Sequence, residues 1–322
     1  MSSILQIKNL KVYFPVKGTI LSAVKFVKAV DDITFDVNSG EILGIVGESG
    51  CGKSSLAKAL VGLNPIASGE VILDENQLLH QYNKSQWQNV YKDIQFIFQD
   101  PIAALDPRMT VLDIIMEPLL SYQADLNKKQ MVDLVIDMME KVGLTREQIN
   151  RYPSEFSGGQ CQRIAIARAL ILKPKLLICD EAVSALDATV KAQIIKLLKD
   201  LQQEMRLTII FISHDLSVVR HICDRVLVMY LGNIMELAST DSLYTNPLHP
   251  YTKILLNAAP VPDPKIERSK KTEFLNGELP SNVDVPVGCV FSSRCPLVDD
   301  NCKKYRSRLE QYNTSIAACF KV

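Results

Sequence analysis

The chain has 322 residues, of which 47% are hydrophobic and 22% are charged, a balance typical of a folded globular protein with two domains or one domain with appendages. Thirty-six basic side chains balance thirty-six acidic ones, so the net charge gives no support to wholesale binding of a nucleic-acid backbone. The first residues lack the basic segment and long apolar core of a secretory signal, and no apolar run approaches the roughly 20 residues that span a bilayer. We therefore expect a cytoplasmic protein whose membrane role, if any, comes through other subunits.

Short apolar strands alternate with helices along the chain, as in a parallel or mixed α/β sheet. The predicted strands cover residues 33–37, 42–46, 71–73, 94–98, 176–179, 208–212, 225–229 and 232–236. The predicted helices cover residues 53–62, 111–121, 128–142, 159–172, 189–205 and 216–221. The block from about 101 to 160 holds helices without strands, which predicts a helical subdomain inserted between two parts of the sheet. After about residue 245, prolines and loops replace the periodic pattern, and we place a domain boundary there.

A phosphate-binding loop is the first chemical motif in chain order. Residues 47–54 read Gly-Glu-Ser-Gly-Cys-Gly-Lys-Ser, follow the apolar run 42–46 and open a helix-compatible stretch. Glycines let backbone N–H groups and a helix N-terminus face one bound anion, the lysine reaches the outer phosphates, and the serine hydroxyl joins the shell of a Mg²⁺ ion. The sequence therefore predicts nucleoside triphosphate binding by Gly47, Glu48, Ser49, Gly50, Cys51, Gly52, Lys53, Ser54 and Ser55.

Two acidic residues follow the apolar strand 176–179. A carboxylate at the C-terminal end of a strand lies at the edge where open α/β sheets bind ligands. We predict that Asp180 holds the water shell of the Mg²⁺ ion and that Glu181 polarises the attacking water as a general base.

A third motif lies between these two, where Ser157, Gly158, Gly159 and Gln160 follow Phe156 and open a helix. This run resembles the signature sequence of ATP-binding-cassette (ABC) ATPases, with phenylalanine where leucine is commoner. Three further landmarks of that family stand in the expected order: Gln99, Asp187 and His214. Together with the phosphate loop, the acidic pair and the signature run, they make six landmarks across residues 47–215.

The resemblance implies an α/β fold: an ABC-type P-loop ATPase domain, with a RecA-like core, an antiparallel β part and an inserted helical subdomain, plus a small C-terminal extension. It also implies a head-to-tail pair of such domains, in which Ser157 and Gly159 of one face the terminal phosphate held by the partner. Gln99 would touch Mg²⁺, His214 would contact the γ-phosphate, and Asp187 would link the two sites. A base-stacking aromatic is expected near the N-terminus, where Phe14 fits best and Tyr13 is the second candidate; either one packed under a strand is the alternative.

The C-terminal part narrows the resemblance. Residues 246–253, Asn-Pro-Leu-His-Pro-Tyr-Thr-Lys, look like the extension of bacterial oligopeptide and dipeptide importers, some of whose relatives import nickel. From residue 4 onward the chain resembles their ATPase subunits, and residues 180–184 resemble the second of the two such subunits that these importers usually carry. We expect an ATPase domain at 1–245, with its helical signature subdomain at about 100–160, and an extension at 246–322.

Four of the eight cysteines lie in the last 34 residues: Cys289, Cys295, Cys302 and Cys319. Disulfides are disfavoured in a cytosolic chain, so four clustered thiols favour metal binding over cross-linking, although their spacing matches no typical zinc ribbon. Related importer tails with the run Gly-Cys-x-Phe-x-x-Arg-Cys-Pro, here residues 288–296, are associated with a [4Fe–4S] cluster. A zinc ion and four unligated thiols are the alternatives.

The function that these motifs imply is Mg²⁺-dependent ATP hydrolysis that powers peptide import at the cytoplasmic face of the inner membrane. The implied partners are two transmembrane permeases, a second ABC ATPase in a heterodimer and, indirectly, an extracytoplasmic peptide-binding protein, with no nucleic acid. Import of nickel or another small solute, and an ABC ATPase that acts outside transport, are the alternatives. The tail as a redox or metal sensor that regulates the motor is a third hypothesis.

Overall fold

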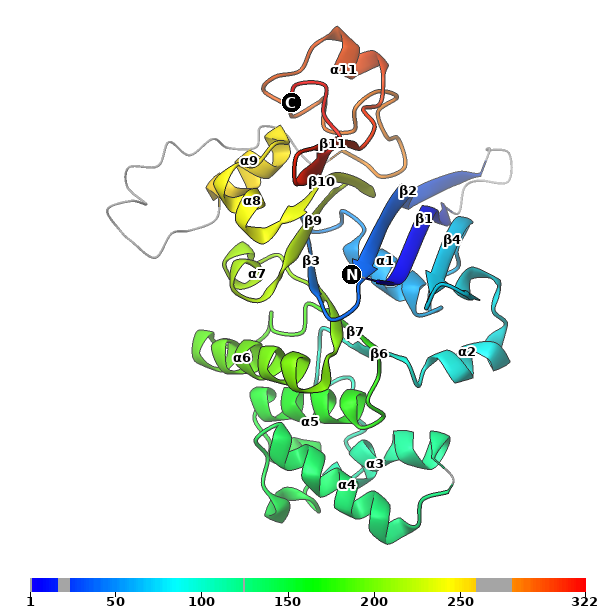
Figure 1. Cartoon of the computed structure of the whole chain (residues 1–322), viewed down its shortest axis with the longest axis vertical. Coiled ribbons are helices and arrows are strands. Elements are labelled where there is room, and N and C mark those ends of the chain that lie inside the picture. Colours follow the sequence, from blue (N-terminus) through cyan, green and yellow to red (C-terminus); the bar gives the residue numbers. More distant parts are fainter. Residues whose placement is uncertain (1, 17–23, 124, 259–279) are drawn as a thin grey trace. The chain divides into compact units, whose positions relative to one another are not determined.

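The computed structural model describes residues 2–16, 24–123, 125–258 and 280–322 (Figure 1). The chain divides into two compact units. Unit 1 comprises Met1–Gln81 and Ser213–Val322, and unit 2 comprises Tyr82–Ile212. No helix in the described ranges is both long enough and apolar enough to span a bilayer.

An antiparallel sheet opens unit 1, with strand order β2-β1-β4-β5. Its strands are β1 (Ser3–Val16), β2 (Lys25–Asn38), β4 (Ser68–Leu73) and β5 (Gln77–Leu78), and the short 3-10 helix η1 (Leu79–Gln81) follows. The sequence pattern predicts only parts of β2 and β4 and misses β1. The reason is a bulge: Asn9 has a φ of 49°, and the register with β2 shifts between Ile7 and Leu10, which interrupts the alternation of buried and exposed residues.

Five further strands of unit 1 are neighbours in the order β11-β12-β10-β9-β3. Strand β3 (Ile42–Val46) is buried along its whole length and pairs in parallel with β9 (Arg225–Tyr230). The other pairs are antiparallel and add β10 (Asn233–Ser239), β12 (Ser315–Ala317) and β11 (Glu310–Tyr312). Pairing of β12 with β10, and of β11 with β12, stabilises the two short C-terminal strands, which have no sequence periodicity of their own.

The helices of unit 1 are α1 (Lys53–Leu60), α7 (Leu216–Ile222), α8 (Thr240–Thr245), α9 (Pro250–Ala258) and α11 (Asp300–Lys304). The expectation that loops replace regular elements after residue 245 is therefore wrong for α9, α11, β11 and β12. Pro250 is the first residue of α9, a position where a missing N–H group costs no helical hydrogen bond.

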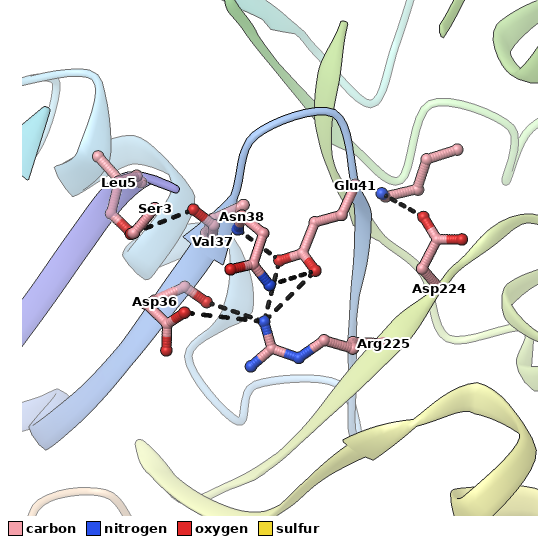
Figure 2. A network of polar contacts seen from close by, with 9 residues as sticks. Ser3, Leu5, Asp36, Val37, Asn38, Glu41, Asp224 and Arg225 are labelled. Atoms are coloured by element: carbon pink, nitrogen blue, oxygen red, sulfur yellow. Dashed lines mark hydrogen bonds and ion pairs between the residues drawn. The ribbon is translucent and has the colours of Figure 1, made fainter. Parts of the chain in front are cut away.

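A polar network centred on Glu41 fixes the start of β3 (Figure 2). The Glu41 carboxylate accepts hydrogen bonds from the Asn38 backbone at 2.7 Å and from Arg225 Nη1 at 3.0 Å. Asp224 accepts the backbone N–H of Ile42, the first residue of β3, at 2.8 Å. These bonds tie the end of β2 and the start of β9 to the strand that leads into the phosphate loop.

Unit 2 contains three parallel strands in the order β8-β7-β6: β6 (Ile94–Ile97), β7 (Leu176–Asp180) and β8 (Thr208–Ile212). Its α-helices are α2 (Lys84–Val90), α3 (Val111–Tyr122), α4 (Lys128–Lys141), α5 (Gly158–Leu170) and α6 (Ala188–Met205). Two 3-10 helices, η2 (Arg146–Gln148) and η3 (Pro153–Glu155), precede α5. Apart from residue 124, which is not described, the stretch between β6 and β7 has no strand, and α3, α4 and α5 pack on one another there.

Candidate functional site

The phosphate loop of unit 1 is a glycine-rich loop between a strand and a helix. Strand β3 ends at Val46, and α1 begins at Lys53. Gly47 has a φ of 153°, and a Cβ atom there would lie 2.2 Å from the carbonyl oxygen of Met229. Gly52 has a φ of 107°, and a Cβ atom there would lie 1.9 Å from the carbonyl oxygen of Ala29. The loop can follow this path only with glycine at both positions.

Lys53 stabilises the loop from inside. Its side chain is buried, and Nζ donates hydrogen bonds to the carbonyl oxygens of Gly47 at 2.8 Å and Glu48 at 3.0 Å. Ser54 and Ser55 follow in the first turn of α1 and are partly exposed. A cation and the positive end of a helix dipole therefore converge on this loop, the electrostatic setting that a phosphate group requires.

His214 belongs to the same unit as the phosphate loop. The backbone N–H of Ser213 donates to the carbonyl oxygen of Ile45 at 3.3 Å, and Ile45 lies two residues before Gly47. His214 is exposed and directly precedes Asp215, whose carboxylate caps the N-terminus of α7. The structure thus places His214 next to the end of the strand that leads into the phosphate loop.

Unit 2 brings together the two acidic residues and Gln99. Asp180 is the last residue of β7 and is buried, and Glu181 follows it with a φ of 50°. Hydrogen bonds hold that left-handed backbone. The Glu181 N–H donates to the carbonyl oxygen of Ile212 at 3.1 Å, and the carbonyl oxygen of Glu181 accepts from the Ser184 hydroxyl at 2.9 Å. Gln99 Nε2 donates to the Glu181 carboxylate at 3.0 Å. Non-glycine residues in this region of φ cluster at functional sites.

The signature residues form the N-terminus of α5 in unit 2. Ser157 is the N-cap, its hydroxyl accepts the Gln160 N–H, and the Gln160 side chain accepts the Ser157 N–H at 3.0 Å. Gly159 packs against the first turn of α6, where a Cβ atom would lie 2.3 Å from Cγ1 of Val190. Asp187 caps that helix by accepting the N–H groups of residues 189 and 190 at 3.0 Å. The signature segment and Asp187 therefore lie on two helix N-termini that pack together.

The two candidate base-stacking aromatics lie side by side on β1, and successive residues of a strand point to opposite faces. Tyr13 donates its hydroxyl hydrogen to Asp31, whose carboxylate also accepts from Arg306 at 2.9 Å. Burial alone would raise the pKa of Asp31, but these two donors hold it below its usual value. The hydroxyl group of Tyr13 thus has a structural role, whereas Phe14 is partly exposed and pairs with Val27 across the strands.

The four C-terminal cysteines are free thiols in unit 1. Burial raises the pKa of Cys289 to about 11; the Phe291 N–H opposes the shift, and repulsion from the three neighbouring cysteines in their thiolate form adds to it. The pKa values of Cys295 and Cys319 are also raised, chiefly by burial. In the described ranges no set of three or more cysteine, histidine or acidic side chains is arranged to hold a metal ion, so the side-chain geometry does not support the predicted metal site.

Three residues of the C-terminal part of unit 1 contact the phosphate loop, although the sequence motifs assign none of them to the nucleotide site. Arg294 donates to the Glu48 carboxylate, Tyr251 accepts the Glu48 N–H at 3.0 Å, and Asn282 donates to the Gly50 carbonyl oxygen at 3.0 Å. Their only sequence signal is proximity to features noted for other reasons, since Arg294 precedes a cysteine and Tyr251 lies in the proline-rich run. Contacts at such sequence separations come from the tertiary structure alone.

The chain is similar to known proteins over nearly its whole length. A family model described as "ABC transporter" matches residues 30–184, and one described as "Oligopeptide/dipeptide transporter, C-terminal region" matches residues 235–302. The oligopeptide transport ATP-binding protein OppF of Salmonella typhimurium is 53% identical over 99% of this chain and 96% of its own length. The chain belongs to the ABC transporter ATPase family. The dipeptide transport ATP-binding protein DppF of Escherichia coli K12 is 45% identical to this ABC ATPase over 99% of the chain and 94% of its own length.

Solved structures agree on the fold of this ABC ATPase. The ATP-binding cassette MJ0796, in a dimeric post-hydrolysis state bound to ADP and Pi, is 26% identical with a TM-score of 0.66, over 73% of this chain and 98% of that one. The cbiO1 protein of Clostridium perfringens, part of the ABC transporter complex cbiONQ, is 26% identical with the same TM-score of 0.66, over 76% of this chain and 92% of that one. The predicted cassette fold is confirmed, and the ABC ATPase is an ATP-binding enzyme that hydrolyses ATP.

Proposed function

We propose that this ABC ATPase powers the import of oligopeptides or dipeptides across the cytoplasmic membrane. The observation that carries the proposal is the match of residues 235–302 to the C-terminal region of oligopeptide/dipeptide transporters, because the cassette itself is common to ABC ATPases of every cargo. The similarity to OppF and DppF over 99% of the chain supports it. The domain boundary near residue 245 is part of the same proposal, with the ATPase domain before it and the peptide-importer extension after it.

The roles proposed for the site residues follow from their surroundings. Backbone N–H groups within residues 47–55 and the side chains of Lys53 and Ser54 bind the phosphates, with Lys53 released from the loop carbonyls as the anion arrives. Glu181 acts as the general base on the attacking water, in the orientation that its backbone hydrogen bonds and Gln99 provide. His214 contacts the γ-phosphate. Phe14, with Tyr13 as the alternative, stacks on the base.

A Mg²⁺ ion is the metal cofactor that we propose for ATP hydrolysis. Ser54, Gln99 and Asp180 carry the hydroxyl, amide and carboxylate oxygens that Mg²⁺ prefers, and we assign them as its ligands or as partners of its bound water. When bound, the ion neutralises charge on the phosphate oxygens.

A pair of cassettes would complete each nucleotide site. Ser157 is exposed at the N-terminus of α5, as a residue that meets a partner's nucleotide must be, and Asp187 lies at the adjacent N-terminus of α6. We propose a heterodimer with a second ABC ATPase that docks on two permease subunits at the cytoplasmic face of the membrane. An extracytoplasmic binding protein then delivers the peptide.

An iron–sulfur cluster at the four C-terminal cysteines is a separate part of the proposal. Its support is the presence of four cysteines within the last 34 residues, because four thiolates are the usual ligand set of such a cluster. Protein purified without oxygen should then contain about four iron atoms per chain and absorb visible light. Iron-free protein with zinc bound, or with four titratable thiols, would reject the cluster.

Uptake in cells tests the main proposal. A strain lacking this gene should lose uptake of a radiolabelled tripeptide, wild-type protein should restore it, and the E181Q variant should not. Labelled nickel measured in the same cells is the control cargo. Purification from native membranes in mild detergent should recover two permeases and a second ATPase. Normal peptide uptake in the deletion strain, or a complex with ribosomes or nucleic acid, would refute the proposal.

A further inference from the structure

The C-terminal segment makes a partly buried ion pair with the phosphate loop. Arg294 Nη1 donates to both carboxylate oxygens of Glu48, at 2.9 and 3.1 Å. The Arg294 side chain is 7% exposed and that of Glu48 is 25% exposed, so solvent screens this pair far less than a surface ion pair. Both residues lie in unit 1, although 246 positions separate them.

Every polar group of Glu48 has a partner. Its backbone N–H donates to the Tyr251 hydroxyl at 3.0 Å, its carbonyl oxygen accepts from Lys53 Nζ at 3.0 Å, and its carboxylate accepts from Arg294. The N–H group, the carbonyl oxygen and the carboxylate of this second loop residue are therefore all held, and the partners of the N–H group and the carboxylate come from the C-terminal part of the chain.

An aromatic cluster holds Arg294 in position. The Tyr230 hydroxyl accepts from Nη1 at 3.4 Å, and the guanidinium carbon lies 5.9 Å from the centre of the Tyr230 ring. Phe291, three residues before Arg294, is fully buried, with its ring centre 5.2 Å from that of Tyr230 and 5.3 Å from that of Tyr251. This packing limits the positions open to the guanidinium group.

A carboxylate in a phosphate loop raises an electrostatic problem. ATP brings several negative charges to the loop, and an unpaired Glu48 would repel them across a partly buried, weakly screened space. Arg294 supplies the opposite charge and a fixed direction for the carboxylate. Removing the arginine would leave a negative charge without its partner next to the anion site.

We propose that Arg294 is a positioning residue for ATP binding, which holds the Glu48 side chain and neutralises its charge so that the phosphate loop accepts the nucleotide. The proposal rests on the nucleotide-site part of the proposed function and is independent of the cargo. It makes the C-terminal segment part of the apparatus that sets nucleotide affinity.

Binding of a fluorescent ATP analogue, mant-ATP with Mg²⁺, to the purified full chain tests this proposal. R294A should raise Kd roughly tenfold, and the increase should shrink at high salt, because added ions screen the repulsion. R294A/E48Q should return Kd to within about threefold of wild type, since the unpaired charge is gone. In the assembled transporter, R294A should raise KM for ATP with little change in kcat.

The single variant E48Q distinguishes two roles of Arg294: neutralising the Glu48 charge, or only linking two segments of the fold. This test remains valid even if R294A does not fold. If Arg294 neutralises Glu48, E48Q binds mant-ATP as tightly as wild type or more tightly, whereas a purely structural bridge predicts weaker binding. D284N, which removes the exposed Lys25–Asp284 pair of the same segment, is the matched control and should bind like wild type. Equal Kd values for R294A and wild type, or weaker binding by E48Q, overturn the inference. Failure of wild type to bind mant-ATP would instead refute the nucleotide site itself.

Discussion

Gln99 donates a hydrogen bond from its side-chain amide to the Glu181 carboxylate, with 3.0 Å between the two atoms. Gln99 follows β6 and Glu181 follows β7, and these strands are parallel neighbours. Their C-terminal ends therefore present an amide and a carboxylate at one edge of the sheet of unit 2. Movement of the Gln99 side chain would therefore change the position of the Glu181 carboxylate, the proposed general base.

The variant E181Q should lose ATP hydrolysis and keep ATP binding. Glutamine preserves the volume and can still accept the Gln99 hydrogen bond, but it cannot take a proton from water. General-base loss lowers rates by about 10² to 10⁴-fold, and phosphate release by the assembled transporter should fall by that order. Binding of mant-ATP should stay within about twofold of wild type because the phosphate loop is unchanged. Residual hydrolysis above a tenth of wild type would assign the base to another residue.

The variant G159A should destabilise the signature segment. The new methyl group would lie 2.3 Å from Cγ1 of Val190, and a β-branched side chain cannot rotate away easily. We expect a loss of about 1–3 kcal/mol in the free energy of unfolding, measured by urea denaturation. G158A is the matched control, because a Cβ atom there meets Leu186 at an ordinary 3.8 Å.

The double variant G159A/V190A tests the cause of that loss. Truncating Val190 removes the atom that the new methyl group would strike, so the double variant should recover much of the lost stability relative to G159A. Equal stability of the single and double variants would mean that the clash is relieved elsewhere, through movement of α5 or α6.

The variant E41A should destabilise unit 1 by about 1–3 kcal/mol, because it leaves Arg225 and the Asn38 N–H without the carboxylate that they share (Figure 2). Asp36 lies 4.0 Å from the same Arg225 and is half-exposed, so D36A should change stability by less than about 0.5 kcal/mol. Urea denaturation of the two variants measures the difference. If E41A and D36A lose similar free energies of unfolding, the stabilisation comes from the negative charge around Arg225 and not from the hydrogen bonds of Glu41.

The sequence predicts the elements whose pattern is set locally. Strands β3 and β7 are continuous apolar runs and were predicted within one residue, because burial on both faces leaves an unmistakable pattern. Strand β1 was missed because its bulge at Asn9 breaks the alternation, and α9 because its first residue, Pro250, suggests a loop.

The candidate site divides in the same way. Short-range motifs locate the phosphate loop, the acidic pair and the signature helix, since each is a cap, a tight turn or a strand end. The contact of Arg294 with Glu48 depends on how a distant segment folds back on unit 1, and no periodicity or spacing contains that information. The four C-terminal cysteines illustrate the converse: their clustering is visible in the sequence, but the raised pKa of Cys289 depends on its burial in the folded chain.

We expect unit 1 to lose stability in mild acid, because unfolding exposes His249 and allows it to take up a proton. Its ring is buried, Nδ1 accepts the Tyr251 N–H at 3.0 Å, and burial lowers the pKa of His249 to about 4. In the unfolded chain a histidine titrates near pH 6.5, so between about pH 6.5 and 4 the unfolded state binds one more proton than the folded state. The stabilisation is complete above that range and falls by about 1.4 kcal/mol per pH unit as the pH drops through it. Between pH 7.5 and 5.5, urea denaturation should show a loss of about 1.4 kcal/mol from this histidine in wild type and a smaller loss in H249Q. Equal losses would mean that the histidine is protonated in the folded protein at pH 5.5.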